Sequence, residues 1–177
     1  MFQILKTFLL LILFTFSFST KTDLPNVKLK NMNKENVKMV DLTKDGPIVI
    51  NFWNLACEPC KKEMKFLNQF HKKYREDNFQ VFSINMDTPR SMSKVKSFIK
   101  TTGYEFTVLS DPRSESFRKL GGKAMPLLLL VNKDGSIFKR HTGYNPGDEI
   151  ALEEEIKELI LNNNSQSHMI ENEQKSN

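Results

Sequence analysis

Cysteine, tryptophan and histidine are scarce in this chain. Its 177 residues include two cysteines, one tryptophan and three histidines. Two cysteines cannot form the dense disulfide framework of a small secreted domain, and no His-x-x-x-His pair is present to complete a zinc site. The net charge of +5 is modest and the lysines are spread along the chain, which argues against a nucleic-acid-binding protein.

Residues 1–19 predict the compartment in which the protein works. The apolar run from Phe8 to Phe18 is far shorter than the about 20 residues that a membrane span needs. Small Ser17 and Ser19 stand where a signal peptidase requires small side chains. We expect a signal peptide cleaved after Ser19; the alternative is an uncleaved N-terminal anchor that tethers the protein to a membrane. Both interpretations place the rest of the chain outside the cytoplasm, in the periplasm or cell envelope, secreted or anchored.

The remaining residues predict one α/β domain over 24–161 and a disordered tail at 162–177, which is rich in asparagine, serine, glutamine and glutamate. Apolar periodicity predicts a mixed central sheet flanked by helices. The strand Ile48–Trp53 is apolar on both faces and is expected at the centre of the sheet. A hairpin is expected to turn near 33–36, further strands at 79–85, 106–109 and on both sides of 133–135, and helices at 57–75, 91–101, 114–121 and 146–161.

Both cysteines lie in the stretch INFWNLACEPCKKE, where the central strand gives way to a helix. Cys57 is expected at the start of that helix, where free amide groups favour a thiolate over a thiol. Cys57 is then the nucleophile that attacks a disulfide, and Cys60, one turn further, is placed to resolve the mixed disulfide. Pro59 between them fits a first helical turn. A metal site and an inert buried pair are the alternatives, because two cysteines supply half of a zinc site.

Glu63 shares a predicted helix stripe with Cys60, Leu67, Phe70 and Tyr74. Because the other members are apolar or the inward cysteine, we expect the Glu63 carboxyl to be partly desolvated, which raises a carboxyl pKa. A group of this kind, one turn from Cys60, can take the proton of its thiol during exchange. The alternative is an acid at the edge of the stripe that reaches water.

The stretch NFWNLACEPCKKE resembles the active-site turn of the TlpA/ResA-like thioredoxin family of extracytoplasmic thiol-disulfide oxidoreductases. The resemblance extends over about 24–161 and implies a thioredoxin fold with an N-terminal β-hairpin and an inserted helix-strand element after Asn85. It implies Cys57 as the nucleophile, Cys60 as the resolving thiol, and a carboxyl at Glu63 that tunes the cysteine pair.

Two positions bear on that resemblance. Thioredoxins proper carry a buried aspartate six residues before the first cysteine, where this chain has Asn51, as ResA-like members do, so Glu63 is expected to take the proton role. The family usually has a tryptophan directly before the first cysteine, where this chain has Ala56. The flat aromatic surface beside the nucleophile is therefore absent, which affects partner choice and redox potential.

The substrate-binding residues are predicted from the same resemblance. The family implies a cis bond before Pro126, with Met125 offering its backbone to an extended peptide by strand addition. The alternative for Pro126 is an ordinary proline that opens a strand. Trp53, Glu58 and Pro59 complete the predicted substrate-binding set.

The expected activity is thiol-disulfide exchange on secreted or envelope proteins, as a reductant, with apocytochrome c maturation as the family-level substrate. Glu58 places negative charge near Cys57, and a less stable thiolate makes a more reducing pair. No bound cofactor is expected, and electrons are expected from an upstream membrane or envelope thiol reductant. The alternatives are a metallochaperone, for which His141 is the available histidine, and a non-catalytic thioredoxin-like module that binds partners.

Overall fold

The computed structural model of the protein describes residues 24–175. The signal peptide or membrane anchor predicted at 1–19 lies outside the described residues. Among residues 24–175, no helix is both long enough and apolar enough to cross a membrane.

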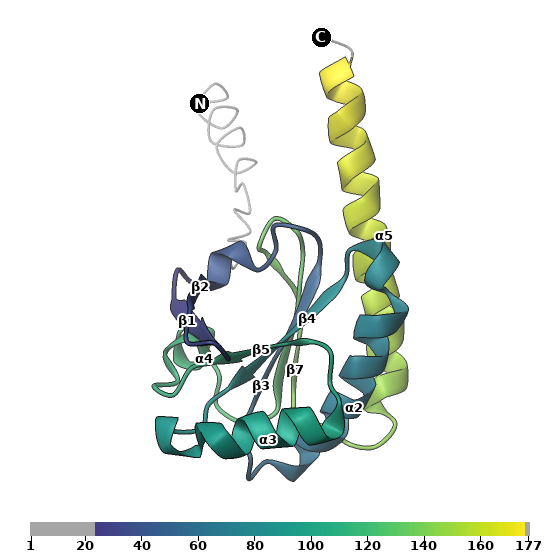
Figure 1. Cartoon of the computed structure of the whole chain (residues 1–177). Helices are drawn as coiled ribbons and strands as arrows, with labels where there is room; N and C mark the ends of the chain where they lie inside the picture. Colours follow the sequence, from purple (N-terminus) through teal and green to yellow (C-terminus); the bar gives the residue numbers. More distant parts are fainter. Residues whose placement is uncertain (1–23, 176–177) are drawn as a thin grey trace, which may run out of the picture.

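A seven-stranded mixed sheet forms the centre of the domain, with the strand order β2-β1-β5-β4-β3-β6-β7 (Figure 1). This confirms the predicted α/β class and its N-terminal hairpin, which is β1 and β2. The strands are β1 (Lys28–Asn31), β2 (Asn36–Lys38), β3 (Ile48–Trp53), β4 (Gln80–Asn85), β5 (Thr107–Ser110), β6 (Leu127–Val131) and β7 (Ile137–Thr142).

Within residues 24–175, α-helices cover both faces of the sheet, and three short 3-10 turns join elements of the domain. The core against α2, α3 and α5 is separate from the core against η1 and α4, and Figure 1 shows α2 and α5 running side by side. The helices are α2 (Glu58–Lys73), α3 (Met92–Thr102), α4 (Glu115–Lys119) and α5 (Asp148–Lys175), and the turns are η1 (Met39–Asp41), η2 (Arg75–Asp77) and η3 (Pro89–Ser91).

The strand β3 lies between β4 and β6, as predicted from its apolar sequence. All six of its residues are buried. Alternate side chains enter opposite cores because successive residues of a strand point to opposite faces: Val49 and Trp53 face α2, whereas Ile50 and Phe52 face α4. The start of α2 is therefore attached to the most enclosed strand of the molecule.

The carboxyl ends of β3, β4 and β5 lie at one edge of the sheet, because β3 pairs parallel with β4 and β4 pairs parallel with β5. The first residues of β6 reach the same edge, since β6 runs antiparallel to β3 and Leu127 lies opposite Phe52. Segments that follow three strands and precede a fourth are thus brought together where open α/β sheets form their sites.

The prediction of a disordered tail from Asn162 is wrong for the described residues, because α5 continues to Lys175 (Figure 1). Asn163 explains why the helix passes the predicted boundary. Its side chain is buried and accepts from the backbone N–H of Lys133 at 2.8 Å, and its amide donates to Asn132 Oδ1 at 3.0 Å. Helix propensity at asparagine is poor, but a tertiary contact of this kind overrides it.

The Asn163 contacts predict a measurable contribution to stability. Replacing Asn163 by alanine removes the acceptor for the backbone N–H of Lys133 and the donor for Oδ1 of Asn132. We therefore expect the free energy of unfolding, measured in denaturant titrations, to fall by about 1–3 kcal/mol. The matched control is Asn164→Ala, since Asn164 is the exposed neighbour. Equal stability of the two variants would show that the side chain of Asn163 does not anchor α5.

Candidate active site

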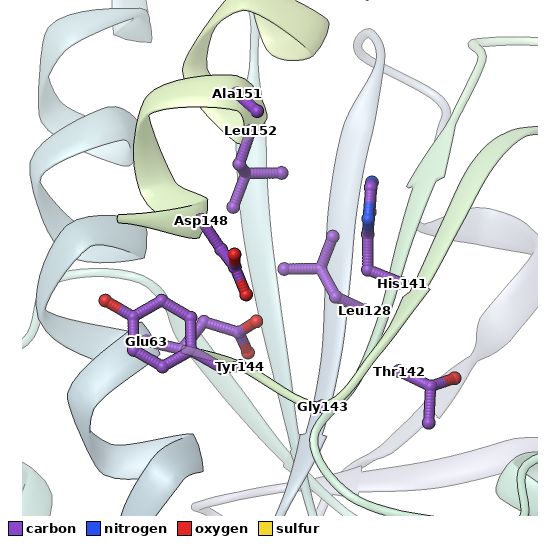
Figure 2. A pocket seen from close by; sticks show the side chains of 9 residues that line it. All are labelled: Glu63, Leu128, His141, Thr142, Gly143, Tyr144, Asp148, Ala151 and Leu152. Carbon is purple, nitrogen blue, oxygen red and sulfur yellow. The ribbon is translucent and has the colours of Figure 1, made fainter. Parts of the chain in front are cut away.

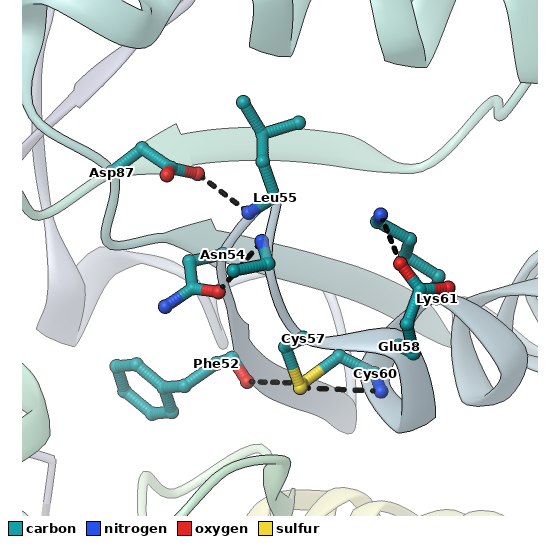
Figure 3. Close-up of a disulfide and its surroundings, with 9 residues drawn as sticks. Phe52, Asn54, Leu55, Cys57, Glu58, Cys60, Lys61 and Asp87 are labelled. Carbon is teal, nitrogen blue, oxygen red and sulfur yellow. Dashed lines mark hydrogen bonds and ion pairs between the residues drawn. A yellow bond between two sulfur atoms is a disulfide. The ribbon is translucent and has the colours of Figure 1, made fainter.

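The two cysteines form a disulfide at the junction of β3 and α2 (Figure 3). Cys57 is the N-cap residue of α2 and Cys60 lies in its first turn, with their Cα atoms 5.3 Å apart. Cys57 is partly exposed, whereas Cys60 is fully buried. This is the outward and inward arrangement predicted from the spacing.

The sulfur of Cys57 occupies the position that an N-cap oxygen usually takes. It accepts a hydrogen bond from the backbone N–H of Cys60 at 3.3 Å, as a serine or aspartate oxygen does at other helix starts. Pro59 lies in the first turn, where its missing N–H leaves no partner unsatisfied. After reduction, a thiolate at Cys57 would face the free amides and the positive end of the helix dipole, which lower a thiol pKa.

The sulfur of Cys60 lies 3.9 Å from the carbonyl oxygen of Phe52. A disulfide sulfur carries no proton, so this is a contact and not a hydrogen bond in the oxidised protein. Once the disulfide is reduced, the Cys60 thiol can donate weakly to this carbonyl. The contact favours the protonated form of Cys60 and so separates its state from that of Cys57.

Two polar residues that the sequence reasoning missed hold the loop before Cys57 (Figure 3). The carboxylate of Asp87 accepts from the backbone N–H of Leu55 at 2.8 Å, and the side chain of Asn54 accepts from the N–H of Ala56 at 3.0 Å. Asp87 follows the end of β4 just as this loop follows β3. The signal available in the sequence was the parallel pairing of two predicted strands, which brings the residues after them to one edge.

Glu58 does not act as an isolated negative charge. Its carboxylate accepts from Lys61 Nζ at 2.7 Å, and this hydrogen bond holds the pKa of Glu58 below its usual value. The Lys61 charge offsets the Glu58 charge at the helix start. The structure therefore weakens the electrostatic reason for expecting a strongly reducing pair.

Glu63 lies inside the domain, as its helix stripe predicted. It is only 3% exposed, and its Oε2 atom is buried with no hydrogen-bond partner among the described residues. Burial, followed by the negative charge of Asp148, raises the pKa of Glu63 to about 8. The carboxyl is therefore mostly protonated at neutral pH, and it loses its proton in the same pH range in which thiols ionise.

A cavity of about 210 Å³ gives Glu63 access to its surroundings (Figure 2). Figure 2 shows the carboxyl groups of Glu63 and Asp148 pointing toward one another, with Tyr144 beside them. The Tyr144 hydroxyl donates to Glu149 Oε2 at 2.7 Å, and burial raises the pKa of Tyr144. His141 also lines the cavity and lies 2.6 Å from Glu155. These residues come from β7, the loop after it and the first turns of α5, so helix spacing around Glu63 could not have revealed them.

The bond between Met125 and Pro126 is cis, as the resemblance implied. It directly precedes β6, whose first residue Leu127 lies opposite Phe52, so the proline stands at the same sheet edge as the disulfide. The carbonyl of Pro126 accepts from the N–H of Gly143 at 2.8 Å. The backbone of Met125 makes no hydrogen bond within residues 24–175, which leaves it open to an extended peptide.

Trp53 is not placed to touch a substrate. Its side chain is fully buried, and its ring lies 5.4 Å from that of Phe98 in the core under α2 and α3. The predicted contact with substrate is therefore wrong for this structure. The physical reason is strand parity: Trp53 shares the face of Val49, which points under α2 and not beyond the sheet edge.

At the centre of the sheet, Asn51 stands where thioredoxins proper carry a buried aspartate. Its side chain is fully buried beside Ser83 in the register of β3 and β4. Neither side chain has a hydrogen-bond partner among the described residues. Asparagine does not ionise, so Asn51 cannot exchange a proton with the cysteines. The buried carboxyl on α2, one turn after Cys60, is that of Glu63.

A metal site is not evident in this region. Within the part of the chain that the structure describes, no three residues of histidine, cysteine, aspartate or glutamate are grouped to hold an ion. His141 is engaged with Glu155.

The raised pKa of Glu63 predicts how stability depends on pH. Between its unfolded value of 4.5 and its folded value of about 8, the folded protein keeps a proton that the unfolded chain releases, so unfolding becomes easier as pH rises through this window. Glu63→Gln removes this loss. We expect the variant to gain free energy of unfolding relative to wild type between pH 5 and pH 8, by roughly 4 kcal/mol at most. Glu76→Gln, at an exposed site, is the control; parallel pH profiles for wild type and Glu63→Gln would show that Glu63 titrates normally.

Comparisons with known proteins agree with this geometry. The family described as Redoxin matches residues 20–159. The thiol-disulfide oxidoreductase ResA of Bacillus subtilis is 29% identical over 127 residues, which are 72% of this chain and 69% of that protein. The ResA of Bacillus thuringiensis is 27% identical over 135 residues, 76% of this chain and 75% of the relative.

Solved structures show the same fold. A protein of Chlorobium tepidum, named as a candidate thiol:disulfide interchange protein DsbE, superposes with a TM-score of 0.73 at 29% identity, over 81% of this chain and 99% of its own. A thioredoxin-like protein of Porphyromonas gingivalis gives a TM-score of 0.67 at 28% identity, over 77% and 91%. The expected thioredoxin fold is confirmed, and the chain belongs to the Redoxin family as a ResA-like member whose cysteine pair is that of a thiol-disulfide oxidoreductase.

Proposed function

We propose that this protein reduces disulfides in secreted or envelope proteins, with Cys57 as nucleophile and Cys60 as resolving thiol. The observation that carries the proposal is the position of the two sulfurs: Cys57 caps the start of α2 and is partly exposed, whereas Cys60 is buried one turn below it. Only one sulfur can meet a partner, and that sulfur lies where a thiolate is stabilised.

The reaction is a transfer of one electron pair between sulfur atoms. The Cys57 thiolate attacks one sulfur of the partner disulfide, forming a mixed disulfide and releasing the other partner sulfur as a thiolate, which takes up a proton. Cys60 then attacks Cys57, the mixed bond breaks, and the partner leaves as a dithiol. The protein ends with the Cys57–Cys60 disulfide seen in the structure, and no bound cofactor is required.

Glu63 is proposed to accept the proton of Cys60 in the second step. Cys60 is buried, so water has poor access to its thiol. Glu63 follows one turn later on the same face of α2, and its raised pKa of about 8 lies near that of a thiol. When an upstream thiol protein reduces the disulfide again, the protonated carboxyl returns the proton to Cys60.

The substrate is proposed to bind as an extended peptide along Met125, with Pro126, Glu58 and Pro59 lining the approach to Cys57. The free backbone of Met125 supports strand addition. Other parts of the proposal rest on the resemblance to ResA-like proteins and on the apolar leader. They are the reducing direction, the site outside the cytoplasm, the upstream membrane or envelope reductant, and apocytochrome c as substrate.

Cysteine variants test the assigned roles. We expect Cys57→Ser and Cys60→Ser both to lose insulin reduction to the uncatalysed background, because each removes one of the two sulfurs. Only Cys60→Ser should accumulate a mixed disulfide, which non-reducing gels and mass spectrometry detect. Trapping by Cys57→Ser instead would reverse the roles, and bound copper or zinc without turnover in the wild type would favour a metallochaperone.

Glu63→Gln tests the proton transfer. The variant keeps the shape of the side chain but cannot ionise, so the resolving step should slow by about tenfold or more. Its rate should also lose the inflection near pH 8 that ionisation of Glu63 gives the wild type. Stopped-flow measurement of mixed-disulfide decay from pH 6 to pH 9 gives both values, with Glu76→Gln as control. An unchanged profile would remove Glu63 from the reaction.

A further inference from the structure

A second and larger hollow lies beside the N-terminal hairpin, with a volume of about 630 Å³. It is bounded by β1, by the start of α3 and by the segment after β5. Five cationic side chains line it: Lys28, Lys30, Lys34, Lys96 and Arg113. We call this hollow the basic groove.

The basic groove is distinguished by the gathering of five cations around one hollow. Several lysines elsewhere on the surface pair with nearby glutamates, as Lys73 does with Glu153 and Lys157 with Glu154. None of the five groove cations forms an ion pair with a residue of the described chain. Their positive charge is therefore not neutralised by neighbours.

The two acids in the groove do not change this conclusion. Asp111 is buried and accepts hydrogen bonds from the hydroxyl and backbone N–H of Ser116. Glu115 pairs with Lys119 at 2.9 Å. Five cations line the groove against these two carboxylates, so the groove presents net positive charge to solvent.

The basic groove lies at the same sheet edge as the disulfide. Pro89 follows the end of β4 and Arg113 follows the end of β5, whereas Cys57 follows the end of β3. Neighbouring strands are about 4.8 Å apart, so β5 is about 10 Å from β3 across this edge. A protein that presents a disulfide to Cys57 would therefore also contact the basic groove.

The lining of the groove favours a polypeptide over a nucleic acid. Met32 and Met92 lie half-buried in it, and methionine adapts to apolar side chains of different shapes. None of the described lining residues is aromatic, although stacking on aromatic rings is the usual means of holding single-stranded nucleic acid. We propose that the basic groove docks a segment of the partner protein that is rich in aspartate and glutamate and carries apolar side chains between them.

This proposal rests on the proposed thiol-disulfide exchange, because it places a partner on that site. Electrostatic attraction of this kind raises association rates and weakens as salt increases. The basic groove would thus select among disulfide proteins by the charge of the surface beside the disulfide.

The test uses three synthetic peptides that share one disulfide loop and carry an acidic, neutral or basic arm. At about 20 mM salt, the reduced wild type should reduce the acidic peptide about tenfold faster than the neutral one, and about 300 mM salt should remove most of the difference. The basic peptide should be the slowest. Equal rates for acidic and neutral peptides would overturn the proposal.

Two charge-matched variants locate the effect. The triple variant Lys30→Glu, Lys96→Glu and Arg113→Glu should lose the preference for the acidic peptide but reduce the neutral peptide at the wild-type rate.

The control variant changes Lys100→Glu, Lys133→Glu and Arg140→Glu, which are exposed positions outside the groove with the same change in net charge. It should keep the preference. An equal loss in both variants would show that only net charge matters, and would overturn the proposal.

A binding measurement separates this proposal from the proposed function. The fluorescence anisotropy of a labelled acidic peptide without cysteine reports docking on the oxidised protein, whether or not the neutral disulfide peptide is reduced. Affinity that falls about tenfold in the groove variant but not in the control supports docking. Unchanged affinity in the groove variant overturns it, as does tighter binding of a single-stranded oligothymidylate than of the acidic peptide.

Discussion

The placement of one sulfur at the start of α2 is the constraint on which the rest of the site depends. That sulfur accepts from the Cys60 amide, and its helix begins directly after the loop that leaves β3, a strand buried on both faces. The buried strand β3 and the loop held by Asp87 therefore fix the position of the Cys57 sulfur, and the dipole of α2 favours negative charge on it. Stabilising a thiolate at this point requires no cofactor and no separate base, because the backbone itself supplies the partial charge.

Glu63 shows a tension between stability and chemistry. A carboxyl that is 3% exposed destabilises the folded protein whenever it ionises, and the negative charge of Asp148 adds to that cost. The same burial brings its pKa close to that of a thiol, which is where a proton acceptor for Cys60 is most effective. The cavity that Glu63 lines with Tyr144 and Asp148 does not include Cys57 in its lining.

Charge is divided between two neighbouring parts of one sheet edge. At the disulfide, Glu58 and Lys61 compensate one another, so the immediate surroundings of Cys57 carry little net charge. Beyond β4 and β5, the basic groove carries a net positive charge, because its cations outnumber its acids. A near-neutral reaction centre beside a positive docking surface separates the thiol chemistry, which any disulfide can undergo, from the choice of partner. With Ala56 in place of an aromatic surface, selection by a neighbouring groove becomes more important.

The local patterns of the sequence determined the central strand, the hairpins and the helices up to their ends. They also determined the burial of Cys60 and Glu63 and the place of Cys57 at the start of α2, because each depends on neighbours two to four residues apart along the chain. The thioredoxin fold and the cis bond at Pro126 came from the resemblance. Only the tertiary structure decided that Trp53 is enclosed, that Asn163 carries α5 past its predicted end, and that Asp87, Tyr144, Asp148 and the basic groove surround the site. Those features depend on contacts between segments that are distant in sequence, and no local periodicity shows which segments will meet.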